Sequence, residues 1–309
     1  MTDESTTPPE TPLHPWWLRK RTMWFAALCA MGGALVYLTF AVRSDVGASY
    51  TTHFRIGLAV GLALAAFVCE YFDSSLGMGY GTTLTPLLII LGFPVRDIVP
   101  AVMFSQMIAG FAAGAAHHTL GNVTFNRRSH DSHVMLALAS CSLLGGAVAV
   151  GFTLHVPEQY LRIWVGCLIL AIGLFVLATR SRPPAPFSWG RMIALGLLAS
   201  FNKGSSGGGY GPLVMGGQIL AGVQAKRAVG ITALGEALTC LIYLGISIAV
   251  GHFPLWRLAL PLLGGALLSV PLAAYTVKLM PPRTLRGAIA YVTLFLGTLA
   301  LVKVLLLSR

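Results

Sequence analysis

The sequence predicts an all-α polytopic membrane protein with seven spanning helices and two re-entrant Gly-loop hairpins, arranged as two inverted five-element repeats. Three observations predict this fold. Apolar residues make up 56% of the 309 residues and charged residues only 10%, whereas charged residues are about 25% of a typical soluble protein. Most apolar residues fall in runs long enough to cross a bilayer. Two of these runs end in similar glycine-rich stretches that lie 130 positions apart.

The composition also excludes several classes of protein. A mean hydropathy of +0.76 does not fit a soluble enzyme, a disulfide-rich secreted domain or a disordered chain. The net charge is +11, but the basic residues lie between the apolar runs, so they indicate topology and contacts to anionic lipids rather than nucleic acid. The sequence has no Walker loop, no dinucleotide-binding motif, and no Ser/His/Asp or Cys/His arrangement typical of enzymes with a nucleophilic side chain. We therefore expect neither an enzyme nor an ATP-driven pump, and no cofactor.

The elements follow in order from the N-terminus. Residues 1–21 are predicted to be a disordered tail, because they are polar and proline-rich up to a pair of tryptophans and a basic cluster. Residues 22–43 are predicted to form an extra, uncleaved transmembrane helix. The further apolar runs are 55–72, 98–116, 133–155, 158–179, 191–201, 228–250, 257–279 and 285–307.

Two of these runs end in an unusual way. The run 55–72 meets a stretch from Asp73 to Gly81, and the run 191–201 meets a stretch from Asn202 to Gly211. Each stretch is followed by an apolar piece of about 11 residues, which is about half of a crossing at 1.5 Å per residue. Each Gly-rich stretch therefore predicts a break in a helix inside the membrane.

The two breaks belong to an internal repeat. A shift of 130 positions aligns 75–99 with 205–229 without a gap, and eight of the 25 positions are identical, including the Gly-Tyr-Gly triplets. The same shift places Arg96 on Lys226, Asp73 on Lys203 and Gln106 on Glu236. An internal repeat of this kind organises the whole fold.

The distribution of basic residues predicts the orientation. If each break is a hairpin that turns back at mid-depth, 13 Lys and Arg residues lie inside and 7 outside; if each is a crossing, the split is 10 to 10, with Lys203 set aside in both cases. The positive-inside rule favours the hairpins, with a cytoplasmic N-terminus and a periplasmic C-terminus. Three crossings then separate the copies, so repeat A (55–180) and repeat B (191–307) insert with opposite orientation. Inverted repeats with broken helices are a recurrent design of secondary transporters.

The Gly-rich stretches are predicted to bind an anion. Bare N–H groups of successive glycines can form an anion-binding nest, and each stretch opens a half-helix whose N-terminus carries a positive partial charge. Pro212, and Thr82 with Thr83, suit such helix starts. The candidate residues of the first copy are Ser74, Ser75, Gly77, Gly79, Tyr80, Gly81 and Thr82. Those of the second copy are Asn202, Lys203, Ser205, Ser206, Gly207, Gly208, Gly209, Tyr210 and Gly211.

Several of these residues permit a second interpretation. Lys203 can face the anion, or it can form an ion pair with Asp73, and both roles can alternate. Tyr80 and Tyr210 can line the site or pack the loops. The Gly-Tyr-Gly triplet does not indicate a potassium filter, because the surrounding filter sequence is absent.

Acidic and amide side chains near the loops are candidates for proton coupling or gating. Glu236, Glu70, Asp73 and Gln106 are expected at membrane depth, where a carboxylate can carry a coupling proton or fix the packing of a helix. Four histidines around 117–133 are expected in one cytoplasmic loop, where solvated side chains are favoured over a metal site.

The segments SSLGMGYGTTLTPLLIILGFP (74–94) and KGSSGGGYGPLVMGGQILAG (203–222) resemble the paired signature loops of the TauE/SafE family, the sulfite exporters and 4-toluene sulfonate uptake permeases. The resemblance covers about residues 55–307. It implies transport of a small sulfur-containing anion, sulfite or a sulfonate, across the bacterial inner membrane. The first copy has Leu76 and Met78 where the second has Ser206 and Gly208, so the second copy is expected to supply more of the anion contacts.

We therefore expect a secondary transporter that exports sulfite or a small organosulfonate by alternating access. The membrane potential alone would drive an anion outward. The alternatives are an anion channel with the same site, an uptake permease for a different sulfur oxyanion, and an intramembrane binding or sensing protein.

Overall fold

The computed structural model describes residues 56–126, 128–179, 186–221 and 223–279, together with positions 295, 298 and 302. The predicted tail 1–21 and the predicted helix 22–43 lie outside the described residues, and so does the predicted crossing 285–307 apart from those three positions. The architecture below concerns the described residues.

All the regular secondary structure of the described residues is helical. Within those residues the chain contains nine helices and no strand, and six helices are long and apolar enough to cross a membrane. The helices are α2 (Ile56–Leu76), α3 (Tyr80–Ile90), α4 (Val95–Thr119), α5 (His130–His155), α6 (Glu158–Thr179), α7 (Trp189–Ser206), α8 (Tyr210–Leu220), α9 (Ala225–Ala249) and α10 (Trp256–Leu279). The protein is therefore a multi-pass membrane protein, as the sequence predicts.

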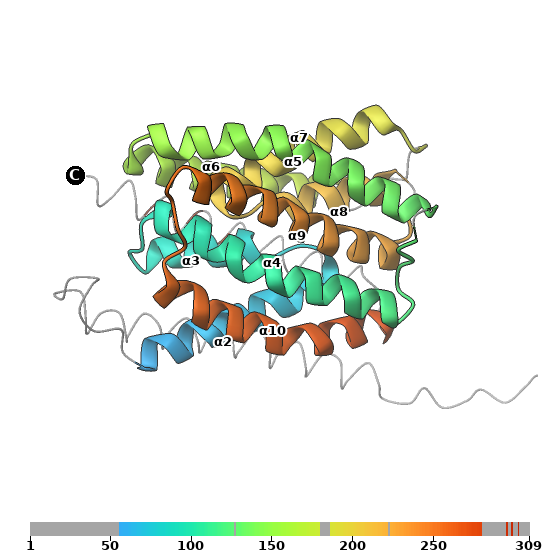
Figure 1. Ribbon diagram of the computed structural model, residues 1–309, viewed down its shortest axis with the longest axis horizontal. Coiled ribbons are helices and arrows are strands. Elements are labelled where there is room, and N and C mark those ends of the chain that lie inside the picture. Colours follow the sequence, from blue (N-terminus) through green and yellow to red (C-terminus); the bar gives the residue numbers. More distant parts are fainter. Residues whose placement is uncertain are drawn as a thin grey trace, which may run out of the picture.

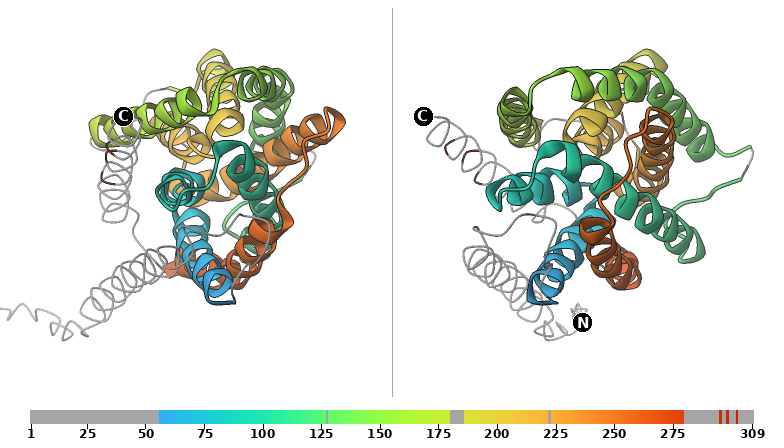
Figure 2. Two further views of the ribbon diagram at one scale, coloured as in Figure 1. Left: turned by 90° about the vertical axis from the view of Figure 1, so that its left-hand side faces the viewer. Right: turned by 60° about the vertical axis from the view of Figure 1, so that its left-hand side comes forward.

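The helices form three layers (Figure 1). Helices α2 and α10 lie along one edge, α5, α6 and α7 lie along the opposite edge, and α3, α4, α8 and α9 lie between them. The long central helices α4 and α9 pack against each other and run in opposite directions (Figures 1 and 2). Leu, Ile, Val and Ala side chains such as Ile98, Val102 and Leu244 fill the space around them. Many apolar side chains on the outer helices, such as Leu144, Leu268 and Val60, are exposed on the molecule's surface, as lipid contact requires.

The two predicted breaks are present, but each is shorter than the sequence indicates. Helix α2 continues through Asp73 to Leu76, and α7 continues through Asn202 to Ser206. Only three residues, 77–79 and 207–209, interrupt the helices before α3 and α8 begin at a tyrosine. Pro212 is consequently the third residue of α8 rather than the first, which still lies in the turn where N–H groups have no intrahelical acceptor.

Glycines with positive φ mark equivalent turns in both halves of the chain. Gly77 and Gly207 have φ of 68° and 74°, and Gly79 and Gly209 have φ of 138° and 84°. Gly121 and Gly251, which end α4 and α9, have φ of 73° and 85°. Each pair is separated by 130 positions. These are backbone conformations that only glycine adopts easily, so the same turn chemistry recurs at the period of the sequence repeat.

Helix packing repeats in the same way. Helix α10 packs along α2, and α5 packs along α7; α10 also packs on α4, and α5 on α9. In the 130-residue alignment α7 corresponds to α2 and α9 to α4. Helix α5 therefore packs on α7 and α9 in the same way as α10 packs on their equivalents, α2 and α4.

Candidate functional site

The two glycine loops meet at the centre of the bundle. A Cβ atom added to Gly81 would lie 1.8 Å from the carbonyl oxygen of Gly207, and one added to Gly211 would lie 2.4 Å from the carbonyl oxygen of Gly77. These two contacts occupy equivalent positions under the 130-residue shift. Only glycine permits such a close approach of one backbone to another, so the N-terminal turns of α3 and α8 lie against the opposite loop.

The start of α3 is occupied by a carboxylate of the protein itself. Asp73 Oδ1 accepts a hydrogen bond from the N–H of Tyr80 at 3.3 Å, and Asp73 Oδ2 accepts one from the Gln106 amide at 2.8 Å. A negative charge at a helix N-terminus is stabilised by the helix dipole. The anion-binding potential of the first copy is therefore already used by Asp73.

The start of α8 has a cation beside it instead. Lys203 stands at the position equivalent to Asp73 and is completely buried. Its ammonium forms an ion pair with Glu236 at 2.8 Å and donates a hydrogen bond to Gln106 Oε1. The sequence-based alternative of a direct Lys203–Asp73 ion pair is thus not what the structure contains, because Gln106 lies between the two residues and bridges them.

Glu70 completes the charged cluster from one turn below Asp73. Its side chain is buried, and Oε1 accepts a hydrogen bond from the Ser74 hydroxyl at 2.6 Å. The other oxygen, Oε2, has no hydrogen-bond partner among the described residues, and neither has the buried hydroxyl of Ser75. The cluster therefore holds three carboxyl groups and one ammonium group in a buried volume.

Hydroxyl and amide groups gather around the second break. The hydroxyls of Ser205 and Ser206 donate to the Asn202 carbonyl at 3.3 and 2.7 Å, and the N–H of Gly208 donates to the Ser206 hydroxyl at 3.1 Å. The Trp164 indole from α6 donates to Ser205 at 3.0 Å. The hydroxyls of Ser205 and Ser206 lie in the last turn of α7, the turn that also contains Lys203.

Both tyrosines of the Gly-Tyr-Gly triplets are fully buried. The Tyr80 hydroxyl lies 2.7 Å from that of Ser105, one residue before Gln106. The Tyr210 hydroxyl lies near Gly235, one residue before Glu236, at 3.2 Å from the position of an added Cβ. The rings therefore pack each loop against α4 or α9, and Thr82 bonds back to the Gly79 carbonyl at 3.2 Å.

Sequence reasoning missed three residues of this centre. Ser105 could have been noticed as the residue beside Gln106, whereas Trp164 carries no signal because α6 lies outside the aligned segments. His117 was expected in a cytoplasmic loop, but it is fully buried in α4. Its Nε2 donates to the Ser74 carbonyl at 2.8 Å, and its Nδ1 accepts from Asn122 at 3.0 Å, so it joins the end of α4 to the end of α2.

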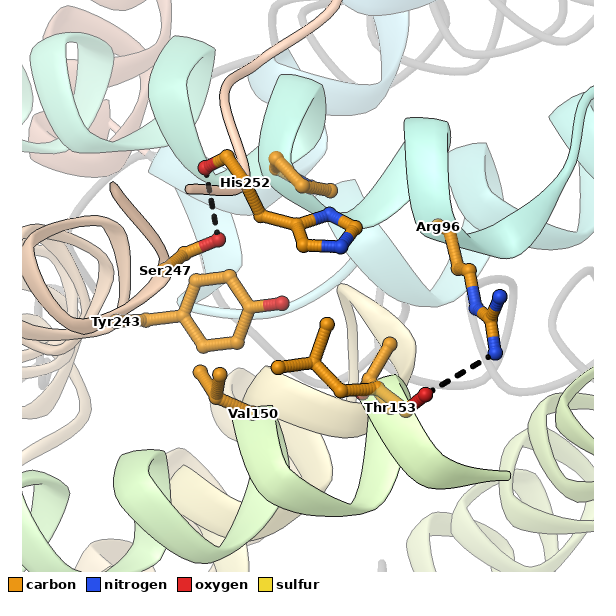
Figure 3. Close-up of a pocket in the computed structure, with 8 residues that line it drawn as sticks. Arg96, Val150, Thr153, Tyr243, Ser247 and His252 are labelled. Atoms are coloured by element: carbon orange, nitrogen blue, oxygen red, sulfur yellow. Dashed lines mark hydrogen bonds between the residues drawn. The ribbon is translucent and has the colours of Figure 1, made fainter. Parts of the chain in front are cut away.

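A second polar group of residues lies at the other end of α4 (Figure 3). The side chains of Tyr243, Ser247 and His252 from α9 and its C-terminal turn face Arg96 of α4 and Thr153 of α5 across a cavity of about 10 Å³. That volume holds about one water molecule. The Arg96 guanidinium donates to the carbonyls of Leu154 and Val156 at 3.2 and 3.0 Å, so it caps the C-terminus of α5.

The arrangement is suited to binding and releasing a charged solute. It combines a buried cation, helix N-termini, several hydroxyl groups and titratable carboxyl groups at one point. Within the part of the chain that the structure describes, no group of three or more His, Cys, Asp and Glu residues could hold a metal ion.

Comparisons with known proteins agree with this description. The family model described as sulfite exporter TauE/SafE matches residues 62–299. The probable membrane transporter protein YtnM of Bacillus subtilis (strain 168) is 25% identical over 234 residues, which cover 72% of this chain and 75% of that protein. A transporter family, not an enzyme family, thus accounts for nearly the whole helical core, and the chain belongs to the TauE/SafE sulfite exporter family of membrane transporters.

Proposed function

We propose that this protein is a secondary carrier that moves a small sulfur-containing anion, sulfite or a small organosulfonate, across the bacterial inner membrane. The anion binds at mid-depth, where the two glycine loops meet. The family supports the class of substrate. The loops contribute backbone N–H groups, and Asn202, Lys203, Ser205 and Ser206 contribute the side-chain donors.

One observation carries this proposal: Lys203 is a fully buried lysine at the end of the broken helix α7, beside the N-terminus of α8. An intramembrane lysine is costly and marks a substrate or ion pathway. In the present conformation Glu236 neutralises it. An arriving anion displaces the Glu236 carboxylate from Lys203, so substrate binding requires that the ion pair break.

The second copy is the stronger binding half. Asp73 occupies the N-terminus of α3, whereas the equivalent residue beside α8 is a cation. A substrate anion is repelled by the first position and attracted by the second. The close contact of Gly81 with Gly207 and of Gly211 with Gly77 favours a carrier, which must rearrange, over an open anion channel.

We further propose that residues 55–180 and 191–307 are two inverted repeats, each with a re-entrant hairpin. The paired positive-φ glycines and the antiparallel course of α4 and α9 support this (Figure 1). The excess of basic residues on one side supports a cytoplasmic N-terminus. Alternating access then consists of one repeat moving against the other around the site. If the anion moves alone, the membrane potential drives export.

Flux of radiolabelled sulfite into proteoliposomes tests the proposal, with wild type beside Lys203→Ala and with sulfate, phosphate and a C2 sulfonate as competitors. We expect saturable flux in the wild type that the variant loses. Arg191→Ala is the matched control, because Arg191 is exposed and, among the described residues, donates to the Pro186 carbonyl at the surface. Equal flux in Lys203→Ala would remove Lys203 from the site, and conductance far above carrier turnover would indicate a channel.

A further inference from the structure

Glu70 differs from the other carboxyl groups of the cluster in having almost nothing to stabilise a negative charge. It is 1% exposed. Its oxygen Oε1 accepts one hydrogen bond, from the neutral Ser74 hydroxyl, and Oε2 has no partner among the described residues. A buried carboxylate with an orphaned oxygen is costly.

The other two carboxyl groups are well matched to carry a charge. Glu236 contacts the Lys203 ammonium at 2.8 Å. Asp73 accepts from the Gln106 amide and from the N–H of Tyr80, at the positive end of α3. Both carboxylates therefore have partners that stabilise a negative charge. Glu70 has no direct contact with an ammonium group, an amide donor or a helix N-terminus among the described residues.

The charge count of the cluster leads to the same residue. With all groups ionised, the three carboxylates and one ammonium leave the buried centre with two negative charges. A substrate anion beside Lys203 would make this three. A proton on one carboxyl group relieves that repulsion, and Glu70 is the group for which ionisation is least supported.

We propose that Glu70 carries one proton that binds and moves together with the substrate anion, so that the protein is a proton–anion symporter. The inference rests on the proposed anion site at Lys203. The anion favours the protonated form of Glu70 and, by thermodynamic reciprocity, the proton favours anion binding. Glu70 gives the proton to the solution on whichever side the site opens, together with the release of the anion from Lys203.

The groups that face Glu70 come from five helices. Asp73, Glu236 and Lys203 act on it electrostatically, and Ser74 donates to it. Further titratable groups nearby are Cys69 on the same helix, Tyr80 on α3, His117 on α4 through the Ser74 carbonyl, and Cys240 on α9. Among the described residues, Lys203 is the cation that acts on Glu70, and Glu236 already binds it.

Symport with a proton changes the direction in which the sulfonate is transported. One proton with one monovalent sulfonate is an electroneutral pair, so the membrane potential no longer favours export. A proton gradient that is acidic outside then drives uptake of the sulfonate. The unaccompanied anion would move the opposite way in the same cell, and Glu70 thus decides between the two directions that the family resemblance leaves open.

Equilibrium accumulation of radiolabelled ethanesulfonate in proteoliposomes tests the proposal, because this sulfonate has no proton of its own to exchange near neutral pH. For the wild type we expect about tenfold accumulation per pH unit of gradient and no response to a clamped potential. Glu70→Gln mimics the protonated acid. It should retain sulfonate counterflow, ignore the pH gradient, and accumulate sulfonate about 50-fold across 100 mV, positive inside.

The matched control is Glu158→Gln, because Glu158 lies outside the cluster and bonds to Val95 and Arg162 at the ends of the helices. It should behave as the wild type does. Electroneutral, pH-driven accumulation in Glu70→Gln would overturn the assignment of the proton to Glu70. Accumulation that follows the potential in the wild type would overturn symport, while leaving the carrier itself intact.

A second measurement does not depend on transport. The infrared spectrum of the purified wild type at neutral pH should contain a protonated-carboxyl band that Glu70→Gln lacks and Glu158→Gln retains. Persistence of that band in Glu70→Gln would place the proton on another residue. Absence of flux for every anion tested would refute the proposed function, and the infrared band would still decide whether Glu70 holds a proton.

Discussion

The ammonium of Lys203 and the carboxylate of Glu236 form an ion pair 2.8 Å long between α7 and α9, and both side chains are at most 5% exposed. The same ammonium donates to Gln106, which occupies the position equivalent to Glu236 in the first half of the chain. One lysine thus joins both central helices. Its charge is balanced inside the protein, so under the proposed function substrate binding is an exchange of partners at Lys203.

Replacing Lys203 should have separable effects on stability and on binding. Lys203→Met preserves most of the side-chain volume but leaves the Glu236 carboxylate buried without a cation, which costs about 3–5 kcal/mol. The double variant Lys203→Met/Glu236→Gln removes that unpaired charge and should recover most of the loss. Thermal unfolding in detergent measures stability, and equilibrium binding of sulfite measures the site.

We expect sulfite binding to be absent in both variants, although the double variant is stable. A double variant that binds sulfite as the wild type does would show that Lys203 serves only to balance Glu236. A single variant as stable as the wild type would contradict the buried ion pair itself.

The exchange of partners also predicts a gain of affinity. In Glu236→Gln the lysine no longer has a carboxylate to compete with the substrate, so sulfite should bind more tightly, by about tenfold or about 1.4 kcal/mol. Release should slow correspondingly, which lowers turnover. Isothermal titration of the purified variant gives the affinity; weaker binding than in the wild type would mean that Glu236 helps to hold the anion rather than competing with it.

Much of the helical architecture follows from hydropathy and glycine content. The spans of α4, α5, α6, α9 and α10 lie close to the predicted apolar runs, and both short helices follow the predicted breaks. Long apolar segments can cross a bilayer in few conformations other than a helix, which is why hydropathy identifies them. The last turns of α2 and α7 were harder to predict, because they contain serines beside Asp73 or Asn202, and these residue types ordinarily favour caps and turns over helix interiors.

The partners inside the site could not be derived in the same way. The sequence repeat draws attention to Asp73, Lys203, Gln106 and Glu236 as related positions. It could not show that Gln106 bridges Asp73 and Lys203, since that depends on how α4 crosses α7 and α9. His117 was misplaced for a similar reason: its burial comes from a hydrogen bond to the end of α2, 43 residues earlier.

Glycine substitutions should distinguish the loops from the spanning helices. Gly209 has φ of 84°, and an added Cβ would lie 2.5 Å from Ile172 Cδ1. Gly209→Ala should therefore cost at least about 1–2 kcal/mol and reduce sulfite flux. Gly151→Ala in α5 is the matched control, because an added Cβ meets nothing within 4 Å there. Equal flux in the two variants would argue against a rigid loop at the site.

The proposed inverted orientation of the two halves predicts opposite accessibility at equivalent ends. Helices α4 and α9 run in opposite directions (Figure 1) and end at the paired turns Gly121 and Gly251. Thr124, just beyond the first turn, is exposed, and Phe253, just beyond the second, is 63% exposed. With a cytoplasmic N-terminus, position 124 lies inside the cell and position 253 outside.

Cysteines placed one at a time at 124 and 253 test this orientation, in a background where the five native cysteines have been replaced by serine or alanine. A membrane-impermeant maleimide should label Phe253→Cys in intact spheroplasts and Thr124→Cys only after the membrane is permeabilised. Labelling of both from outside would mean that the halves are parallel. The reverse pattern would keep the inverted repeat but turn the protein over, and position 96 with its positive charge would then face the cytoplasm.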